Sequence, residues 1–418
     1  MSTRRLIATN TLIQLLGKAA TTATSFGTTY LLGRYLGVEF YGDFTKVIAT
    51  STLLFMVLDF GLNAIAIKQS KYSPQNLTYT FRSLLGLRLI VATTIYAFIL
   101  LSLFLLPTPT NHGYTSLIKT NIALFALQYF TQAIILSTNF LFQSQLRYGR
   151  AVVATSLGNL AQFGLILAVI GAHPSLNTIT LVHLFGIIVT ASIGLMLSKS
   201  HVSSLLPLFS LSTTKSLLIA ASPIGIALTL NIFATKLDTI ILSMYRTSTE
   251  VGYYGLARRI FDGILVIPSF FMNAVYPILI EKSIHTRSRL PKIIAETTLF
   301  LVIAGIVTGA VVFIASPLIL FIRPEFAPSI NVLRLLSAFL PVFFVTNLYM
   351  WCAITLGKQR SLILVYAAAL AANSSLNLVL LPKFGFQVAA LTTGITETLV
   401  LVLLTWPVLQ SLRDLKQK

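Results

Sequence analysis

The sequence predicts an all-α polytopic membrane protein with about twelve transmembrane helices in two six-helix lobes. Apolar residues make up 56% of the 418-residue chain and charged residues only 10%, whereas soluble domains carry about 25% charged residues. A helix needs roughly 20 residues to cross a bilayer, so twelve such helices leave only short connections. Because no connection is long enough for a catalytic domain, we expect the function to lie between the helices.

Twelve apolar stretches meet this length requirement. In chain order they are 6–32, 47–67, 84–106, 116–142, 151–171, 177–197, 217–244, 253–279, 294–322, 330–352, 361–381 and 386–409. Six precede the longest hydrophilic connection near the middle of the chain and six follow it. We therefore expect an N-terminal lobe over residues 1–200, a cytoplasmic connecting loop over 201–216 and a C-terminal lobe over 217–418.

Internal similarity supports the division into two lobes. Superposing Tyr41-Gly42 on Tyr254-Gly255 shifts the sequence by 213 residues, maps the third stretch onto the ninth and brings Arg147 onto Arg360. Because six is an even number of spans, both lobes would have the same orientation, as in a parallel repeat.

The net charge of +19 does not indicate nucleic acid binding here, because the cations lie mainly in the connections. With the N-terminus inside, 19 of the 30 Lys and Arg residues fall on the inner side, 8 on the outer side and 3 within spans. This bias follows the positive-inside rule. It predicts a cell-membrane protein with both termini in the cytoplasm.

The sequence lacks the signatures of common enzymes and metal sites. The single cysteine, Cys352, excludes an intramolecular disulfide and a site with several cysteine ligands. The five histidines have no metal-binding spacing, and no P-loop or Gly-x-Ser-x-Gly motif is present. We expect no enzyme activity, cofactor or metal; a membrane-embedded glycosyltransferase or polymerase is the distant alternative.

Polar residues recur at helical spacing inside the first stretch. Asn10, Gln14, Lys18, Thr21 and Ser25 lie on one face over four turns. Polar side chains at this depth must face protein or water, so this face predicts either hydrogen bonds between helices or the lining of a polar cavity. Asn10, Gln14 and Lys18 are therefore candidates for substrate binding.

Ionisable residues inside the stretches are more informative, since each costs about 2.5–3.5 kcal/mol at mid-helix. Besides Lys18, they are Asp59, Lys236, Asp238 and Glu397. Lys236 and Asp238 are two residues apart and point to different sides of a helix, so we do not expect them to pair with each other. One interpretation is buried ion pairing. The other is an anion-binding site in which Lys236 contacts the substrate and the carboxylates act as counter-charges or carry a coupling ion.

Arginines gather near the predicted outer ends of the same helices. Arg34, Arg258 and Arg259, with Asp262 one turn further on, suit two roles. Their long side chains would anchor the helix ends at the lipid head groups, or their planar guanidinium groups would bind phosphate. Both interpretations stay open.

Several sequence patterns resemble polysaccharide-biosynthesis flippases of the multidrug/oligosaccharidyl-lipid/polysaccharide (MOP) superfamily. The residues that carry the resemblance are Asn10, Gln14, Lys18, GRYLG at 33–37, YG at 41–42, DFGL at 59–62, DTIIL at 238–242, EVGYY at 250–254 and ARRI at 257–260. Together with the twelve spans, these patterns cover essentially the whole chain.

The resemblance implies a MATE-like fold of two six-helix lobes around a cavity that opens alternately to each side. It implies transport of polyprenyl-pyrophosphate-linked oligosaccharide units across the cytoplasmic membrane, with the lipid-linked oligosaccharide and the bilayer as partners. A polysaccharide polymerase or glycosyltransferases would be further partners, and H⁺ or Na⁺ the coupling ion. By analogy, Lys18, Arg34, Asp59, Lys236, Asp238 and Arg258 fall on polar positions of helices that line the cavity.

Two alternatives belong to the same superfamily. A drug or metabolite cation antiporter would favour an acidic, aromatic cavity, which the excess of cations here does not indicate. A peptidoglycan-precursor (lipid II) flippase would often carry additional helices beyond the twelve stretches.

Overall fold

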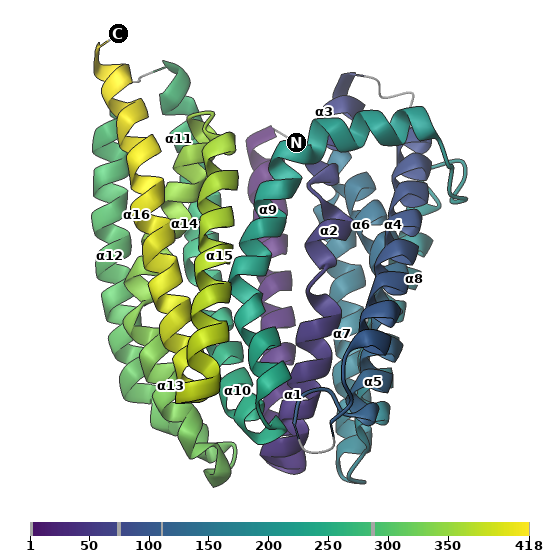
Figure 1. The fold of residues 1–418 in the computed structure, drawn as a ribbon. Coiled ribbons are helices and arrows are strands. Elements are labelled where there is room, and N and C mark those ends of the chain that lie inside the picture. The colour runs from purple at the N-terminus through teal and green to yellow at the C-terminus, as the bar shows by residue number, and fades with distance from the viewer. Residues whose placement is uncertain (1–2, 73–76, 110–111, 286–288, 418) are drawn as a thin grey trace. The chain divides into compact units, whose positions relative to one another are not determined.

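The computed structural model describes residues 3–72, 77–109, 112–285 and 289–417, which form helices and short connections without a strand. The helices are α1 (Thr3–Thr52), α2 (Phe55–Asp59), α3 (Leu62–Tyr72), α4 (Leu77–Leu105), α5 (Ser116–Ala126), α6 (Gln128–Ser144), α7 (Tyr148–Ile170), α8 (Leu176–Ser198), α9 (Leu211–Tyr245), α10 (Ser248–Ile264), α11 (Val266–His285), α12 (Leu290–Ala315), η3 (Ser316–Phe321), η4 (Pro324–Phe326), α13 (Ala327–Ala338), α14 (Leu340–Thr355), α15 (Gln359–Phe384) and α16 (Gln387–Gln417) (Figure 1).

The predicted polytopic all-α fold is confirmed. Within the described ranges, 10 helices are long and apolar enough to cross a membrane, and the pair Pro324–Ala338 and Leu340–Thr355, bent by 46°, raises the number to 11. The first of them, Gly17–Lys68, has 52 residues. At 1.5 Å per residue it would be about 78 Å long if straight, more than twice the roughly 30 Å of hydrocarbon. It has room for two predicted stretches, which accounts for the difference from twelve.

Two breaks divide this N-terminal helical run. Gly37 kinks α1 with φ 83° and ψ 178°, a conformation that is essentially restricted to glycine. Phe60 and Gly61, with φ 44° and 68°, separate α2 from α3, and the Phe60 N–H donates to the Met56 carbonyl at 2.7 Å. This left-handed turn places Asp59 at the last position of α2.

The chain divides into two compact units. The first comprises residues 1–36, 46–110 and 114–229, and the second comprises 37–45, 111–113 and 230–418. Helix α9 therefore contributes to both units, and residues 37–45 of α1, directly after the Gly37 kink, belong to the second. The division of the chain into two six-helix lobes at the connection 201–216 stays a prediction.

In the first unit, α6 packs against α4 and α8, and α7 packs against α8. Two glycines bring α7 and α8 close together. A Cβ at Gly158 would lie 1.9 Å from the Thr190 hydroxyl oxygen, and one at Gly186 would lie 2.6 Å from the Gln162 Cβ. Small residues at these positions permit the close helix packing that is common in membranes.

In the second unit, α14 packs against α12 and α16, and α15 packs against α16 (Figure 1). Glycines also bring the middle of α1 against α10. A Cβ at Gly42 would lie 1.6 Å from the Ser248 carbonyl oxygen, and one at Gly252 would lie 2.3 Å from the Val38 carbonyl oxygen. The Ser248 hydroxyl also donates to the Asp43 carboxylate. The segment 37–45 is thus fixed to α10 by contacts between backbones.

The exposed surface of α12 is apolar from Leu299 to Ile314. Its exposed large side chains are Leu299, Phe300, Ile303, Ile306, Val307, Val311, Phe313 and Ile314. A continuous apolar face of this size is rare in a soluble monomer, and it is the surface expected of a helix in contact with lipid.

Candidate functional site

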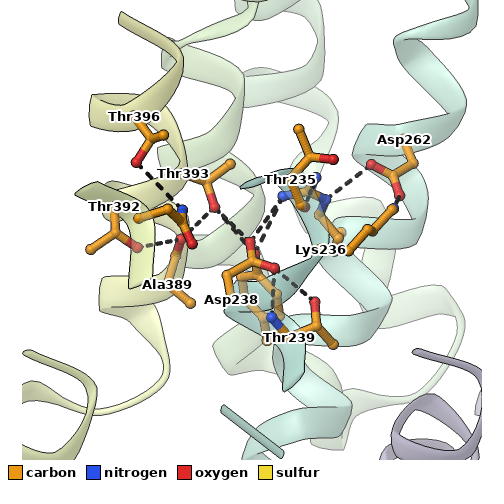
Figure 2. A network of polar contacts seen from close by, with 12 residues as sticks. Thr235, Lys236, Asp238, Thr239, Asp262, Ala389, Thr392, Thr393 and Thr396 are labelled. Carbon is orange, nitrogen blue, oxygen red and sulfur yellow. Dashed lines mark hydrogen bonds and ion pairs between the residues drawn. The ribbon is translucent and has the colours of Figure 1, made fainter. Parts of the chain in front are cut away.

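Asp238, on α9, is fully buried at the centre of a polar network in the second unit (Figure 2). Its Oδ2 accepts hydrogen bonds from the Tyr254 hydroxyl at 2.5 Å and the Thr393 hydroxyl at 2.7 Å. The Arg258 Nη1 donates to the same oxygen at 3.2 Å. The Oδ1 accepts from the Thr239 N–H at 2.5 Å. Donors from α9, α10 and α16 therefore hold this carboxylate in one orientation.

Arg258, on α10, is buried and bonded along its whole guanidinium group. Besides its contact with Asp238, its Nε donates to the Asp262 Oδ1 at 2.9 Å and its Nη2 to the Thr235 carbonyl at 2.9 Å. The Lys236 Nζ lies 2.5 Å from the Asp262 Oδ2. The four charges alternate in sign along Asp238, Arg258, Asp262 and Lys236, so the network is neutral as a whole. As their spacing predicts, Lys236 and Asp238 have different partners.

Lys236 differs from the other members of the network because its side chain is 40% exposed. Arg258 and Asp238 are 7% and 0% exposed. The ion-pair chain therefore runs from the packed interior of the second unit to an accessible lysine.

Hydroxyl and amide groups on α15 and α16 extend the network beyond Asp238. The Thr392 hydroxyl donates to the Asn377 Oδ1 at 2.8 Å, and the Asn377 Nδ2 donates to the Asn373 Oδ1 at 3.0 Å. The Thr393 hydroxyl also lies 2.7 Å from the Ala389 carbonyl oxygen. Figure 2 shows Thr393 pointing from α16 toward Asp238. Carboxylate, hydroxyl, amide and carbonyl oxygens are the ligands that hard cations prefer.

Glu397 lies one turn beyond Thr393 on α16. It is close enough to Arg258 to interact with it electrostatically. Two of the three predicted carboxylates, Asp238 and Glu397, thus lie near the same arginine. Among the described residues, no group of three or more His, Cys, Asp or Glu side chains has the arrangement of a metal site.

The third carboxylate, Asp59, belongs to a separate network in the first unit. Arg88, on α4, is fully buried, and its Nη2 lies 3.3 Å from the Asp59 Oδ1 and 2.9 Å from the Asn63 Oδ1. Its Nη1 donates to the Ser137 hydroxyl at 3.3 Å. The buried Nε has no partner among the described atoms. Because the Asp59 side chain is 25% exposed, one side of this ion pair is accessible.

The remaining predicted cavity residues whose side chains the structure describes lie on exposed positions. The side chain of Asn10 is outside the described part of the structure. Gln14 and Lys18 are exposed on α1, and Arg34 and Arg259 are exposed on α1 and α10. An exposed lysine on a membrane-spanning helix needs water or an anion nearby, because hydrocarbon does not solvate its charge.

Three residues of these networks are not identified as site residues by the sequence patterns. Arg88 is one of the 19 Lys and Arg residues that the charge pattern assigns to the inner side, although it lies in an apolar stretch and faces Asp59. Tyr254 and Asp262 each lie four residues from Arg258, and this i, i+4 spacing on α10 is the available signal.

Comparison with known proteins identifies the family. The model of the family described as "Polysaccharide biosynthesis protein" matches residues 7–284, which is more than half of the chain. No curated protein sequence matches significantly.

Three solved structures illustrate the fold. The lipid II flippase MurJ in an inward closed conformation has a TM-score of 0.74 at 14% identity, covering 96% of this chain and 90% of that chain. An inward-facing multidrug resistance MATE transporter of the MOP superfamily has a TM-score of 0.78 at 14% identity, covering 95% and 96%. The MATE multidrug transporter DinF-BH has a TM-score of 0.71 at 16% identity, covering 98% and 96%. At these identities the likeness concerns the fold.

The family match, the membrane-spanning helices and the structural likeness agree with one another. The chain belongs to the polysaccharide biosynthesis protein family and has the fold of MOP-superfamily flippases and transporters.

Proposed function

We propose that this protein is a flippase that moves polyprenyl-pyrophosphate-linked oligosaccharide units from the cytoplasmic to the outer leaflet by alternating access. The family match supports a role in polysaccharide biosynthesis. We choose an anionic cargo because Lys18 and Lys236 are accessible on membrane-spanning helices. Organic cations, the cargo of a drug antiporter, would be repelled by Lys18, whereas Asp262 balances the charge of Lys236.

The chemistry of the cargo explains why such cations are needed. A diphosphate joined to sugars cannot enter hydrocarbon, so its hydration must be replaced along the whole path. Lys18, with Gln14 on the same face of α1, and Lys236 would supply charge and hydrogen bonds. Arg34 and Arg259 would add guanidinium groups that match phosphate oxygens. The polyprenyl tail would stay in the surrounding lipid.

The buried carboxylates serve a different purpose in this proposal, since an anionic cargo gains nothing from direct contact with them. Asp238 is the strongest candidate for ion coupling, because the Tyr254 and Thr393 hydroxyls contact it and the network continues to amide and carbonyl oxygens on α15 and α16. A proton or Na⁺ at Asp238 would compete with the Arg258 guanidinium at 3.2 Å. Asp59, paired with Arg88, and Glu397 would act as counter-charges.

Transport by purified protein in proteoliposomes tests the cargo. Wild-type protein should move a fluorescent polyprenyl-diphosphate oligosaccharide between leaflets, and Lys18→Ala and Arg34→Ala should abolish this movement at unchanged protein levels. Lys292→Ala, which removes a lysine that is 79% exposed beside Glu296, is the matched control and should transport normally. Normal transport by the Lys18 and Arg34 variants would contradict the proposal. Preferred transport of lipid II or of an organic cation would favour the lipid II flippase or the antiporter.

Amide variants test the coupling under an imposed pH or Na⁺ gradient. Asp238→Asn should stop gradient-driven transport while allowing slow equilibration of the lipid across the bilayer. Asp59→Asn and Glu397→Gln, as counter-charge variants, should remain partly active and become insensitive to the gradient. Full gradient-driven activity in all three would eliminate the coupling role.

The proposed direction of transport requires the predicted topology, with both termini and the connection 201–216 in the cytoplasm. The cargo would then be received from cytoplasmic glycosyltransferases and passed to a polymerase on the outer side. The cell membrane is the expected location of such a multi-pass protein.

A further inference from the structure

A cluster of positive charge lies at the ends of α6, α7 and α8 in the first unit. Arg147 lies in the turn between α6 and α7, Arg150 in the first turn of α7, and His201 after the end of α8. The Arg147 Nη1 lies 2.6 Å from the His201 Nε2, and the Arg150 Nη1 lies 2.8 Å from the His201 Nδ1. One imidazole thus bridges two guanidinium groups from different parts of the chain.

No carboxylate pairs with either arginine among the described residues. The Arg150 Nη1 also donates to the Leu197 carbonyl at 2.9 Å and the Ser200 hydroxyl at 3.2 Å, which ties α7 to the end of α8. This structural role uses only Nη1. In the described part of the chain, the Nε and Nη2 groups of both arginines donate to no protein acceptor. Each guanidinium therefore keeps two of its three nitrogens available for an anion.

The histidine does not supply a third charge at neutral pH. Burial, followed by the neighbouring charges of Arg150 and Arg147, lowers the pKa of His201 below its usual 6.5. A neutral imidazole can accept a hydrogen bond from an arginine and leaves the two guanidinium charges beside each other. The two guanidinium groups, both in contact with the same imidazole, repel each other. An anion between them would attract both.

The position of the cluster along the spans indicates where this anion comes from. The membrane-spanning helices Ser116–Ser144, Tyr148–Ile170 and Leu176–Ser198 end or begin beside it, so it lies at the level of the lipid head groups. Val153, Leu157 and Leu160 follow Arg150 at i+3, i+7 and i+10, on the same face of α7. They are 48%, 46% and 54% exposed. An exposed apolar stripe thus leads from the cationic cluster into the depth of the membrane.

We propose that Arg147 and Arg150 bind the phosphate of an anionic phospholipid whose acyl chains lie along the Val153, Leu157 and Leu160 stripe of α7. Guanidinium groups bind phosphate through paired N–H donors, and basic pockets between helices at a membrane surface bind anionic head groups in the same way. The site is distinct from the cargo-binding residues proposed above, and it does not depend on which lipid-linked sugar the protein moves.

Native mass spectrometry of the purified full-length protein tests the proposal. Phosphatidylglycerol and phosphatidylcholine with identical acyl chains differ in head-group charge, and inorganic phosphate has the charge without the chains. We expect wild-type protein to retain phosphatidylglycerol and to bind phosphatidylcholine and inorganic phosphate much more weakly. Combined Arg147→Gln and Arg150→Gln should weaken phosphatidylglycerol binding about 25-fold, since each surface cation contributes about 1 kcal/mol, or about fivefold.

Controls separate loss of the site from loss of the fold. Arg360→Gln removes an exposed arginine near the corresponding turn before α15 and should leave lipid binding within twofold of wild type. If the double variant fails to fold, Arg147→Gln alone, which removes one of the contacts with His201, should still weaken binding about fivefold. Unchanged phosphatidylglycerol binding in the arginine variants would overturn the proposal. Inorganic phosphate binding as tightly as phosphatidylglycerol would overturn the role of the acyl chains and leave a site for free anions.

Discussion

The Asp238 network makes a quantitative prediction about stability. Asp238→Asn removes one charge from a buried chain of alternating ion pairs and leaves Arg258 with a single carboxylate partner, Asp262, at 2.9 Å. Removing one partner of a buried ion pair typically costs about 3–5 kcal/mol, because the other charge stays buried. Since Arg258 keeps Asp262, we expect the lower part of this range.

The amide also introduces a mismatch of hydrogen bonds. One side of the Asp238 carboxylate faces the Thr239 N–H, and the other faces the Tyr254 and Thr393 hydroxyls and Arg258. An asparagine NH₂ group meets an N–H donor or the guanidinium in either orientation, which adds about 1 kcal/mol for an unsatisfied group. We therefore expect Asp238→Asn to lower the free energy of unfolding by about 3–4 kcal/mol.

The assay is thermal or denaturant unfolding of purified protein in detergent, with Glu325→Gln as the control. Glu325 accepts from Arg323 at 3.1 Å, but both side chains are exposed, so its loss should cost less than about 1 kcal/mol. Combining Asp238→Asn with Arg258→Met should cost less than the sum of the two single changes, because the double variant no longer buries an unpaired charge. Additive costs, or an Asp238→Asn variant as stable as the control, would refute the reasoning.

Three further predictions concern the rest of the chain. Cysteine labelling at Ser203, in a background with Cys352 replaced, should occur from the cytoplasmic side only; labelling from outside intact cells would reject the predicted topology. In unfolding experiments, Gly42→Ala should destabilise the protein by about 1–3 kcal/mol or more, because the new Cβ would lie 1.6 Å from a carbonyl oxygen. Gly164→Ala is the control: its Cβ would have nothing within 4 Å, so the change should be neutral or stabilising. NMR titration of His201 should give a midpoint below 6.5, and a midpoint above this value would contradict the geometry. Since the folded state binds this proton more weakly than the unfolded state, the free energy of unfolding should fall as the pH drops below about 6.5.

Composition and apolar periodicity were sufficient to predict the fold class. Membrane helices satisfy their own backbone hydrogen bonds, so length and hydropathy identify them without knowledge of their neighbours. The same local information underlies the polar face of α1 and the expectation that Lys236 and Asp238 do not pair. These features depend on spacing along one helix.

The partners of the buried charges depend on tertiary structure and were not predicted. Asp238 meets Thr393 across 155 positions of sequence, and Asp59 meets Arg88 across 29. Helical spacing gives the side of a helix on which a residue lies, but not the helix that packs against that side. Arg88 illustrates the difficulty, because a cation near the end of an apolar stretch has the sequence pattern of a membrane-surface anchor. Its burial becomes evident only when α2, α4 and α6 are assembled.

The close packing of Gly42 against α10 has a consequence for the biogenesis of the protein. Residues 37–45 leave the ribosome roughly 200 residues before Ser248 and Gly252, the residues that they contact. At about 5–20 residues per second, this segment waits about 10–40 s for its final neighbours. During that interval this segment of α1 is without its contacts with α10, so an insertase or chaperone has time to hold it. Completion of the second unit, rather than of the first, is then the step that ends the folding of the first helix.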